Sequence, residues 1–138
     1  MRATRVSGLS AMLVIFIASL ACNVLTGKPS VSNIRMATDD TGNTTTAVYA
    51  AGDDFYVFAD LNGLYVGSLV EAKWYAVNST GWEPNSELNT SDYTYQPPTR
   101  FIYFRLTTPD GSDWPSGSYK VDLYLDGILT GEQIFSVK

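Results

Sequence analysis

Short segments in which apolar and polar side chains alternate dominate the sequence from about residue 30 onward. The clearest of them runs from Tyr119 to Leu125, and the same alternation is present in 55–61 and in 70–76, where Trp74 falls on the apolar side. Successive side chains of a strand point to opposite faces, so these segments are typical of half-buried β-strands. No stretch of similar clarity has the spacing of an amphipathic helix. The pattern therefore predicts an all-β domain.

Seven candidate strands follow from this alternation, separated by clusters of Gly, Pro, Asn and Asp. They are 32–37, 45–49, 54–61, 69–77, 100–107, 118–125 and 133–137. About seven short strands in one small domain predict an antiparallel β-sandwich of the immunoglobulin-like type. Tyr, Phe and Trp make up 13% of the chain, which agrees with this prediction because aromatic residues favour pleated, half-buried surfaces.

The C-terminal part of the chain carries a more specific pattern. Asp126-Gly127 provides the positive φ angles of a tight hairpin turn, and Gly131 marks an expected bulge. From Trp114 to Gly127, with a Phe-x-Val ending, the sequence resembles the last hairpin of bacterial immunoglobulin-like or fibronectin-III-like domains. In that family a Gly-x-Tyr-x-Val segment begins the penultimate strand, so the resemblance implies a tyrosine corner at Tyr119. The disulfide of antibody domains is missing, since the chain has one cysteine.

The first 21 residues have the pattern of a secretory signal. Arg2 and Arg5 precede an apolar run that ends at Ala21 and is shorter than the roughly 20 apolar residues of a transmembrane helix. Cys22, the sole cysteine, follows at once. Residues 18–22, Ala-Ser-Leu-Ala-Cys, resemble the lipobox of bacterial lipoproteins, although Leu20 stands one position later than usual. The resemblance implies that Cys22 carries a lipid, while plain secretion and an uncleaved anchor helix are the alternatives.

Three regions result from these observations. Residues 1–21 are the expected signal-peptide helix, 22–32 the lipidated cysteine with a flexible tether, and 33–138 the sandwich. The tether is assigned because its residues are small and polar and are interrupted by Gly27 and Pro29. The expected location is the extracytoplasmic side of a bacterial cell envelope, with the membrane contacted through the lipid on Cys22.

Charge and composition argue against several classes of function. Removing residues 1–21 takes away two of nine basic residues and none of fourteen acidic ones, which leaves seven against fourteen, or −7. Such a surface repels phosphate backbones, so nucleic-acid binding is not expected. The chain has no histidine, the commonest general base and metal ligand, and no serine–lysine motif surrounds Lys73 or Lys120. We expect neither an enzyme nor a cofactor.

Acidic residues in the turns offer one alternative, a calcium site. The candidates are Asp39-Asp40, Asp53-Asp54 and the turn from Asp110 to Asp113. Calcium takes six to eight oxygen ligands, which loops at one end of a sandwich can combine. Solvated turn carboxylates are the simpler interpretation.

Outward-facing aromatic residues are the main candidates for function. If 54–61 and 100–107 are neighbouring strands, then Tyr56, Phe58, Phe101 and Tyr103 form one apolar patch on their outer face. Such patches tend to mark interfaces. The patch would be lost if the first strand or residues 93–98 covered it, or if the inferred phase of a strand were wrong by one residue.

A second candidate is the segment 81–99, which is long for a sandwich connection and contains Trp82, Tyr93 and Tyr95. These rings would suit stacking on carbohydrate, or the segment would be a lid on the sandwich edge. The favoured hypothesis is a non-catalytic, membrane-anchored surface lipoprotein that acts as a protein-interaction or accessory module of the cell envelope. A lipoprotein that binds carbohydrate or a small ligand is the alternative.

Overall fold

The computed structural model describes residues 27–138, apart from the side chain of Pro109. This part of the chain forms eight strands and one short 3-10 turn, Pro109–Gly111. The strands are β1 (Ser30–Ala37), β2 (Val48–Tyr49), β3 (Phe55–Asn62), β4 (Leu69–Ser79), β5 (Ser86–Thr94), β6 (Phe101–Leu106), β7 (Gly117–Leu125) and β8 (Ile128–Val137). The predicted signal-peptide helix and Cys22 lie outside the described residues.

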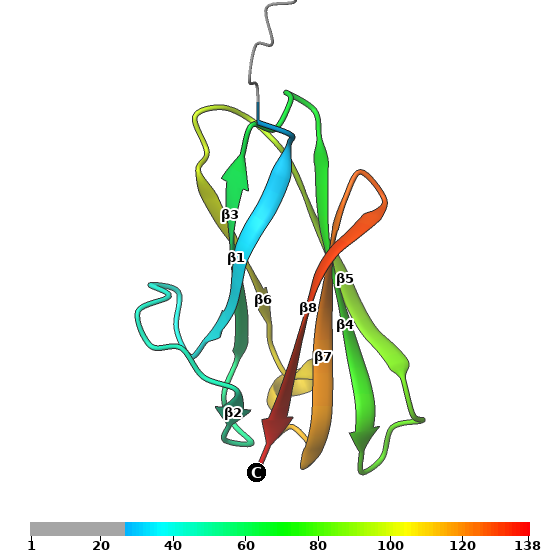
Figure 1. Cartoon of the computed structure of the whole chain (residues 1–138). Coiled ribbons are helices and arrows are strands. Elements are labelled where there is room, and N and C mark those ends of the chain that lie inside the picture. Colours follow the sequence, from blue (N-terminus) through cyan, green and yellow to red (C-terminus); the bar gives the residue numbers. More distant parts are fainter. Residues whose placement is uncertain (1–26) are drawn as a thin grey trace, which may run out of the picture.

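The strands form two sheets that pack face to face (Figure 1). The smaller sheet has the order β1-β3-β6, and the larger has the order β2-β8-β7-β4-β5. All pairs are antiparallel except β2 with β8. The chain therefore changes sheets between β1 and β2, and the Tyr49 hydroxyl donates a hydrogen bond back to the Ala37 carbonyl oxygen at 2.7 Å.

The core between the sheets is made by the predicted apolar sides of the strands. The side chains that alternate inward along β3, β4 and β6, and along β7 up to Leu123, are buried, while Leu125 is partly buried against them. Phe55 lies at the centre of an aromatic cluster, stacked on Trp114 at 4.6 Å between ring centroids and edge-on to Phe135 at 4.7 Å. With no disulfide available to the chain, this packing supplies the principal stabilisation of the domain.

Local features of the last hairpin agree with the sequence. Asp126 and Gly127 both have positive φ, 49° and 81°, as a tight hairpin turn requires. Leu123 pairs with Gly131 and Tyr124 with Leu129, so Thr130 is the extra residue of a bulge next to Gly131, where the sequence predicted one. The Tyr119 hydroxyl donates to the Pro115 carbonyl oxygen at 2.6 Å, four residues upstream, which is the geometry of a tyrosine corner.

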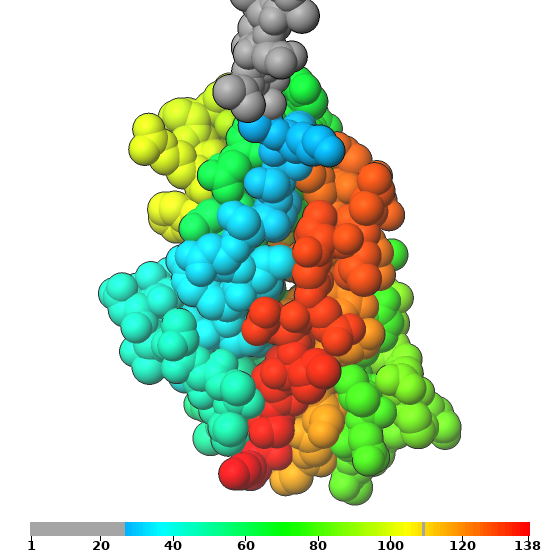
Figure 2. Space-filling model, viewed as in Figure 1, coloured from blue at the N-terminus to red at the C-terminus, as the bar shows by residue number. Residues whose placement is uncertain are grey.

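The seam between β1 and β8 closes one side of the sandwich (Figure 2). A Cβ atom on Gly131 would lie 2.3 Å from Cδ1 of Ile34. The absence of a side chain at Gly131 thus makes room for Ile34, which follows the bulge of β1 at Asn33, where φ is 49°. The two bulges face each other and let the two sheets meet at this seam.

The predicted strands differ from the structure in several places: β2 is only Val48–Tyr49 where 45–49 was expected, and β8 begins at Ile128 where 133 was expected. The segment 81–99 is not one long loop, because Ser86–Thr94 forms β5 and pairs with β4. β5 is an edge strand with mostly polar side chains, so it lacks the alternation by which the other strands were found. The first strand begins at Ser30, so residues 30–32, which the sequence assigned to the tether, belong to the sandwich.

Candidate interaction surface on the smaller sheet

The outer face of the smaller sheet brings the four predicted patch residues together. β3 pairs with β6 so that Phe58 lies opposite Tyr103, and their ring centroids are 5.2 Å apart. Tyr56 lies 5.9 Å from the same Tyr103 ring, and Phe101 is opposite Asp60 at the next outward position. The strand neighbours and the phase inferred from sequence are therefore those of the structure.

The patch is nevertheless not exposed as a whole. Tyr56 is 9% exposed and Phe58 1%, because the loop 38–45 after β1 folds over this face, as Figure 1 shows. The Phe58 ring lies 3.0 Å from the position that a Cβ on Gly42 would take. The expectation that Tyr56 and Phe58 are surface residues is thus wrong, and the covering element is neither β1 itself nor residues 93–98.

Two arginines lie over the buried rings. The Arg35 guanidinium carbon is 5.4 Å from the Phe58 centroid, and that of Arg105 is 5.7 Å from the Tyr56 centroid. Burial raises the pKa of the Tyr56 hydroxyl, against the effect of the nearby Arg105 charge. The rings are therefore sandwiched between the sheet and cationic side chains, a favourable arrangement because ring faces carry partial negative charge.

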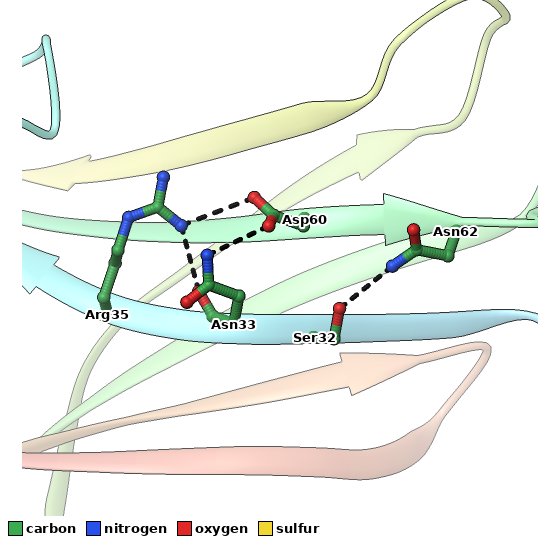
Figure 3. Close-up of polar contacts among 5 residues, drawn as sticks. All are labelled: Ser32, Asn33, Arg35, Asp60 and Asn62. Carbon is green, nitrogen blue, oxygen red and sulfur yellow. Dashed lines mark hydrogen bonds and ion pairs between the residues drawn. The ribbon is translucent and has the colours of Figure 1, made fainter.

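Both arginines are themselves held by carboxylates. Arg105 pairs with Asp54, and this hydrogen bond raises the pKa of the guanidinium group. Arg35 contacts Asp60 at 3.4 Å, and Asp60 also accepts a hydrogen bond from Asn33 at 3.0 Å (Figure 3). These contacts tie β1, β3 and β6 together across the outer face and fix the orientation of the cations.

The exposed remainder of the patch is on β6. Phe101 is 60% exposed and Tyr103 44%, and both belong to an edge strand. The Leu61 amide donates to the Arg100 carbonyl oxygen at 2.8 Å. Hydrogen-bonded pairs alternate along an antiparallel ladder, so the backbone groups of Phe101, Tyr103 and Arg105 face the free edge. The strand thus offers two aromatic side chains beside a row of unpaired amide and carbonyl groups.

The other edge strands of the described domain are protected. β2 is two residues long, and β1 and β5 each contain a register shift in their pairing. β6 pairs with β3 over six residues without a shift and contains neither proline nor lysine. Short length, bulges and lysine are devices that prevent edge-to-edge association. β6 has none of these three, and its one charged side chain, Arg105, is paired with Asp54 over the outer face.

The predicted ligand segment does not form one site. Trp82 is in the turn before β5, whereas Tyr93 and Tyr95 lie at the other end of that strand. A strand of this length separates them by roughly 25–30 Å. Tyr93 and Tyr95 are also partly buried against the core, and the Tyr93 hydroxyl is 2.8 Å from the Thr99 hydroxyl. The three rings therefore cannot stack on the same sugar.

The acidic turns are held by local hydrogen bonds. Asp39 accepts a hydrogen bond from the Thr41 hydroxyl at 2.5 Å, which lowers the pKa of its carboxyl, and a second one from the Thr41 amide at 3.0 Å acts in the same direction. Asp53 accepts from the Ala50 amide at 2.8 Å. Within residues 27–138 no three potential ligands come together around a metal position, and no pocket opens. These carboxylates have the contacts of turn residues.

No helix in residues 27–138 has the length and apolar character needed to cross a bilayer.

Comparisons with known proteins bear on the fold. No protein-family model and no curated protein matches the sequence. The crystal structure of an immunoglobulin-like protein from Pseudomonas aeruginosa is similar, with a TM-score of 0.59 and 11% identity over 83% of this chain and 99% of that one. An alkylpurine DNA glycosylase from Pseudomonas fluorescens gives a TM-score of 0.49 and 14% identity over 81% of this chain and 31% of the glycosylase, which is too weak to bear on function. The chain is an immunoglobulin-like β-sandwich, as its strand pattern predicted.

Proposed function

We propose that the protein is a non-catalytic, membrane-anchored lipoprotein of the cell envelope whose smaller sheet binds a protein partner along β6. The observation that carries the proposal is the unprotected edge of β6 with Phe101 and Tyr103 exposed beside it. The lipobox-like sequence that ends at Cys22 supports the anchor.

The edge geometry favours an extended partner segment. An added strand would take the backbone hydrogen bonds that β6 leaves free, and its alternate side chains would meet Phe101 and Tyr103. Tyr103 gives this pairing an apolar contact, because its ring rests on Phe58 and Tyr56 instead of standing alone in solvent. A buried base of this kind keeps the Tyr103 ring in a fixed position and lowers the entropy lost on binding.

Site-specific cross-linking tests the partner. A photoreactive phenylalanine analogue at Tyr103 of the full chain, expressed in its bacterial host, should cross-link to one defined protein. The same analogue at Ile134, which is 63% exposed on the outer face of the larger sheet, is the matched control. Equal cross-linking from both positions would refute the proposal for β6, as would a cross-link that the substitution Phe101→Asp leaves unchanged.

Two variants at Tyr103 separate backbone from side-chain contacts. Tyr103→Val removes the ring and keeps the amide that faces the free edge, whereas Tyr103→Pro removes both. Proline is tolerated on edge strands, so both variants should fold, which circular dichroism would verify. Strand addition predicts weaker partner binding for Tyr103→Pro than for Tyr103→Val. Equal partner affinities of the two variants would exclude strand pairing and would mean that the aromatic side chains alone make the contact.

A further inference from the structure

The most exposed apolar side chains of the described domain gather at one end of the sandwich. Ile128 is 71% exposed, Tyr65 70% and Val66 69%, and these are the highest values among the large apolar residues described. Tyr65 and Val66 are in the loop between β3 and β4, and Ile128 is in the β7–β8 hairpin. Both loops lie at the end where the chain enters β1, as Figure 1 shows.

Backbone contacts hold the two loops in place there. Asp126 and Leu69 exchange two hydrogen bonds of 2.8 Å, from the Asp126 amide to the Leu69 carbonyl oxygen and from the Leu69 amide to the Asp126 carboxylate. At Gly63 a Cβ would lie 3.2 Å from the Gly27 carbonyl oxygen. The β3–β4 loop therefore lies between the entry of the chain and the hairpin, and the apolar side chains project from fixed positions.

Charge is distributed unevenly between the two ends. The loops at the entry end, 27–29, 63–68, 95–100 and 126–127, contain Lys28, Arg100 and a single acid, Asp126. The loops at the opposite end hold five of the fourteen acids of the chain, which are Asp53, Asp54, Glu83, Asp110 and Asp113. Two more, Asp39 and Asp40, are in the loop 38–45 over the outer face of the smaller sheet. An anionic surface would repel the acidic end and leave the entry end free to approach.

We infer that the β3–β4 loop and the β7–β8 hairpin rest in the headgroup region of the membrane to which the chain is anchored, an inference that depends on the proposed lipidation of Cys22. Five residue steps separate Cys22 from Gly27, so the covalent reach of this segment is at most about 18 Å. The lipid would therefore hold these loops near the bilayer whatever path the segment takes.

The side chains suit that environment. Tyrosine favours the membrane–water interface, where its ring is in an apolar layer and its hydroxyl is hydrated. Val66 and Ile128 add apolar area on either side of it, and residues 61–70 contain no charge. The sandwich then stands with its strands pointing away from the membrane and its acidic end outermost, and β6 remains accessible along its length.

Spin labels at the loop tips test the inference. Val66→Cys and Ile128→Cys would be labelled with a nitroxide in the full chain, extracted from membranes and reconstituted into vesicles of phosphatidylethanolamine and phosphatidylglycerol. Val48→Cys, an exposed valine at the opposite end, is the control. The ratio of collisions with oxygen to collisions with a water-soluble nickel complex should be several-fold higher for labels at 66 and 128 than at 48.

Intact mass on the same preparation separates the two proposals. A diacylglycerol adduct on a chain that begins at Cys22, together with equal ratios at all three labels, would overturn the loop contact and leave the anchor standing. A mass without lipid would overturn the anchor and with it the loop contact. A lipid adduct with immersed labels at both 66 and 128, but not at 48, supports the inference, whereas a label at 66 or 128 that is no more immersed than the one at 48 would overturn it for that loop.

Discussion

Both outer faces of the sandwich place cationic side chains over aromatic rings, but the two faces differ in which cation they use and in what covers the rings. The smaller sheet uses arginine and the larger sheet lysine. The distances from cation to ring centroid are 5.4 Å for Arg35–Phe58, 5.7 Å for Arg105–Tyr56, 4.9 Å for Lys73–Tyr124 and 5.0 Å for Lys120–Tyr75. The rings of the smaller sheet are buried beneath a loop, whereas Tyr75 and Tyr124 are partly exposed.

The two outer faces therefore differ in how their aromatic rings are covered. Charged side chains lie over the rings of the larger sheet, whereas a loop and two arginines hold the rings of the smaller sheet in place. On the larger sheet, Lys120 contacts Asp122 and Glu132, both at 3.1 Å, so that charges cover the aromatic rings. On the smaller sheet the loop and the arginines enclose Tyr56 and Phe58, and these rings in turn support the Tyr103 ring. Cation–ring pairs are thus present on both faces, but only on the smaller sheet are they combined with a covering loop that fixes the rings.

Truncating a buried ring should show this difference most strongly. Phe58→Ala should lower the free energy of unfolding by about 4 kcal/mol, because it leaves a cavity beneath the loop 38–45. Tyr75→Ala, at a half-buried ring on the larger sheet, should cost only about 1 kcal/mol. Urea denaturation of both variants measures the two values. Equal losses would mean that the outer faces do not differ in packing.

Opening the loop should have a smaller effect. Gly42 has φ +68°, and an added Cβ would press on the Phe58 ring at 3.0 Å. Gly42→Ala should therefore cost about 2 kcal/mol, from backbone strain together with displacement of the loop. Gly81→Ala has a similar φ of +85° with nothing within 4 Å, so it should cost about 1 kcal/mol from strain alone. A loss at Gly42 no larger than at Gly81 would show that the loop does not press on Phe58.

Tyr49 belongs to the larger sheet but holds the end of β1 in the smaller one, and burial raises the pKa of its hydroxyl above the ordinary value. The folded and unfolded chains both keep this proton below about pH 10. Above that pH the unfolded chain releases it first, so the stability that Tyr49 contributes declines as the pH rises further. Tyr49→Phe should cost about 1 kcal/mol at neutral pH.

Urea denaturation at a series of pH values checks this expectation. The stability difference between wild type and Tyr49→Phe should be constant at neutral pH and shrink above about pH 10. Tyr65→Phe, at an exposed residue, is the control and should follow the wild type. A difference for Tyr49→Phe that stays constant above pH 10 would contradict the role of its buried hydroxyl.

The weakest expected effect distinguishes lysine from arginine. Hydrogen bonds to Asp122 and Glu132 raise the pKa of Lys120, so its contribution is complete below about pH 10 and is lost as the pH rises through the raised value. Lys120→Met should reduce stability by about 1 kcal/mol at neutral pH, because Asp122, which is 5% exposed, loses its cation while Lys120 itself stays partly in water. The effect of Arg105→Met should persist at pH values where that of Lys120→Met disappears, since guanidinium keeps its proton. If the effects of both substitutions disappeared at the same pH, the proposed difference between the lysine and arginine pairs would be wrong.

Alternation predicted the inward faces of β3, β4 and β6 because the two-residue period is a local property of the chain. β5 was missed for a local reason as well. Its sequence from Ser86 to Thr94 has only Leu88 and Tyr93 as apolar residues, spaced without alternation. An edge strand beside solvent has little need of apolar side chains, so polar sequence alone does not distinguish it from a loop.

Burial of Tyr56 and Phe58 could not be read from the sequence for a different reason. Their outward phase was predicted correctly, but the loop that covers them is rich in Asp, Thr and Asn, with Gly42 at the contact. Such composition indicates a turn and not a lid. Which face a turn folds over depends on the path between the two sheets, a tertiary property that local pattern does not contain.

The strand order β1-β3-β6 has a mechanical consequence. Under the proposed function, a pull from the membrane anchor would enter the domain at the start of β1 and leave through the partner on β6. The load then crosses one three-stranded sheet and bypasses the larger sheet. Antiparallel hydrogen bonds run perpendicular to the strands, so a pull along β1 shears all the bonds of each ladder together instead of opening them one by one. With the proposed anchor and partner in place, the protein would be a stiff link that transmits force from one to the other.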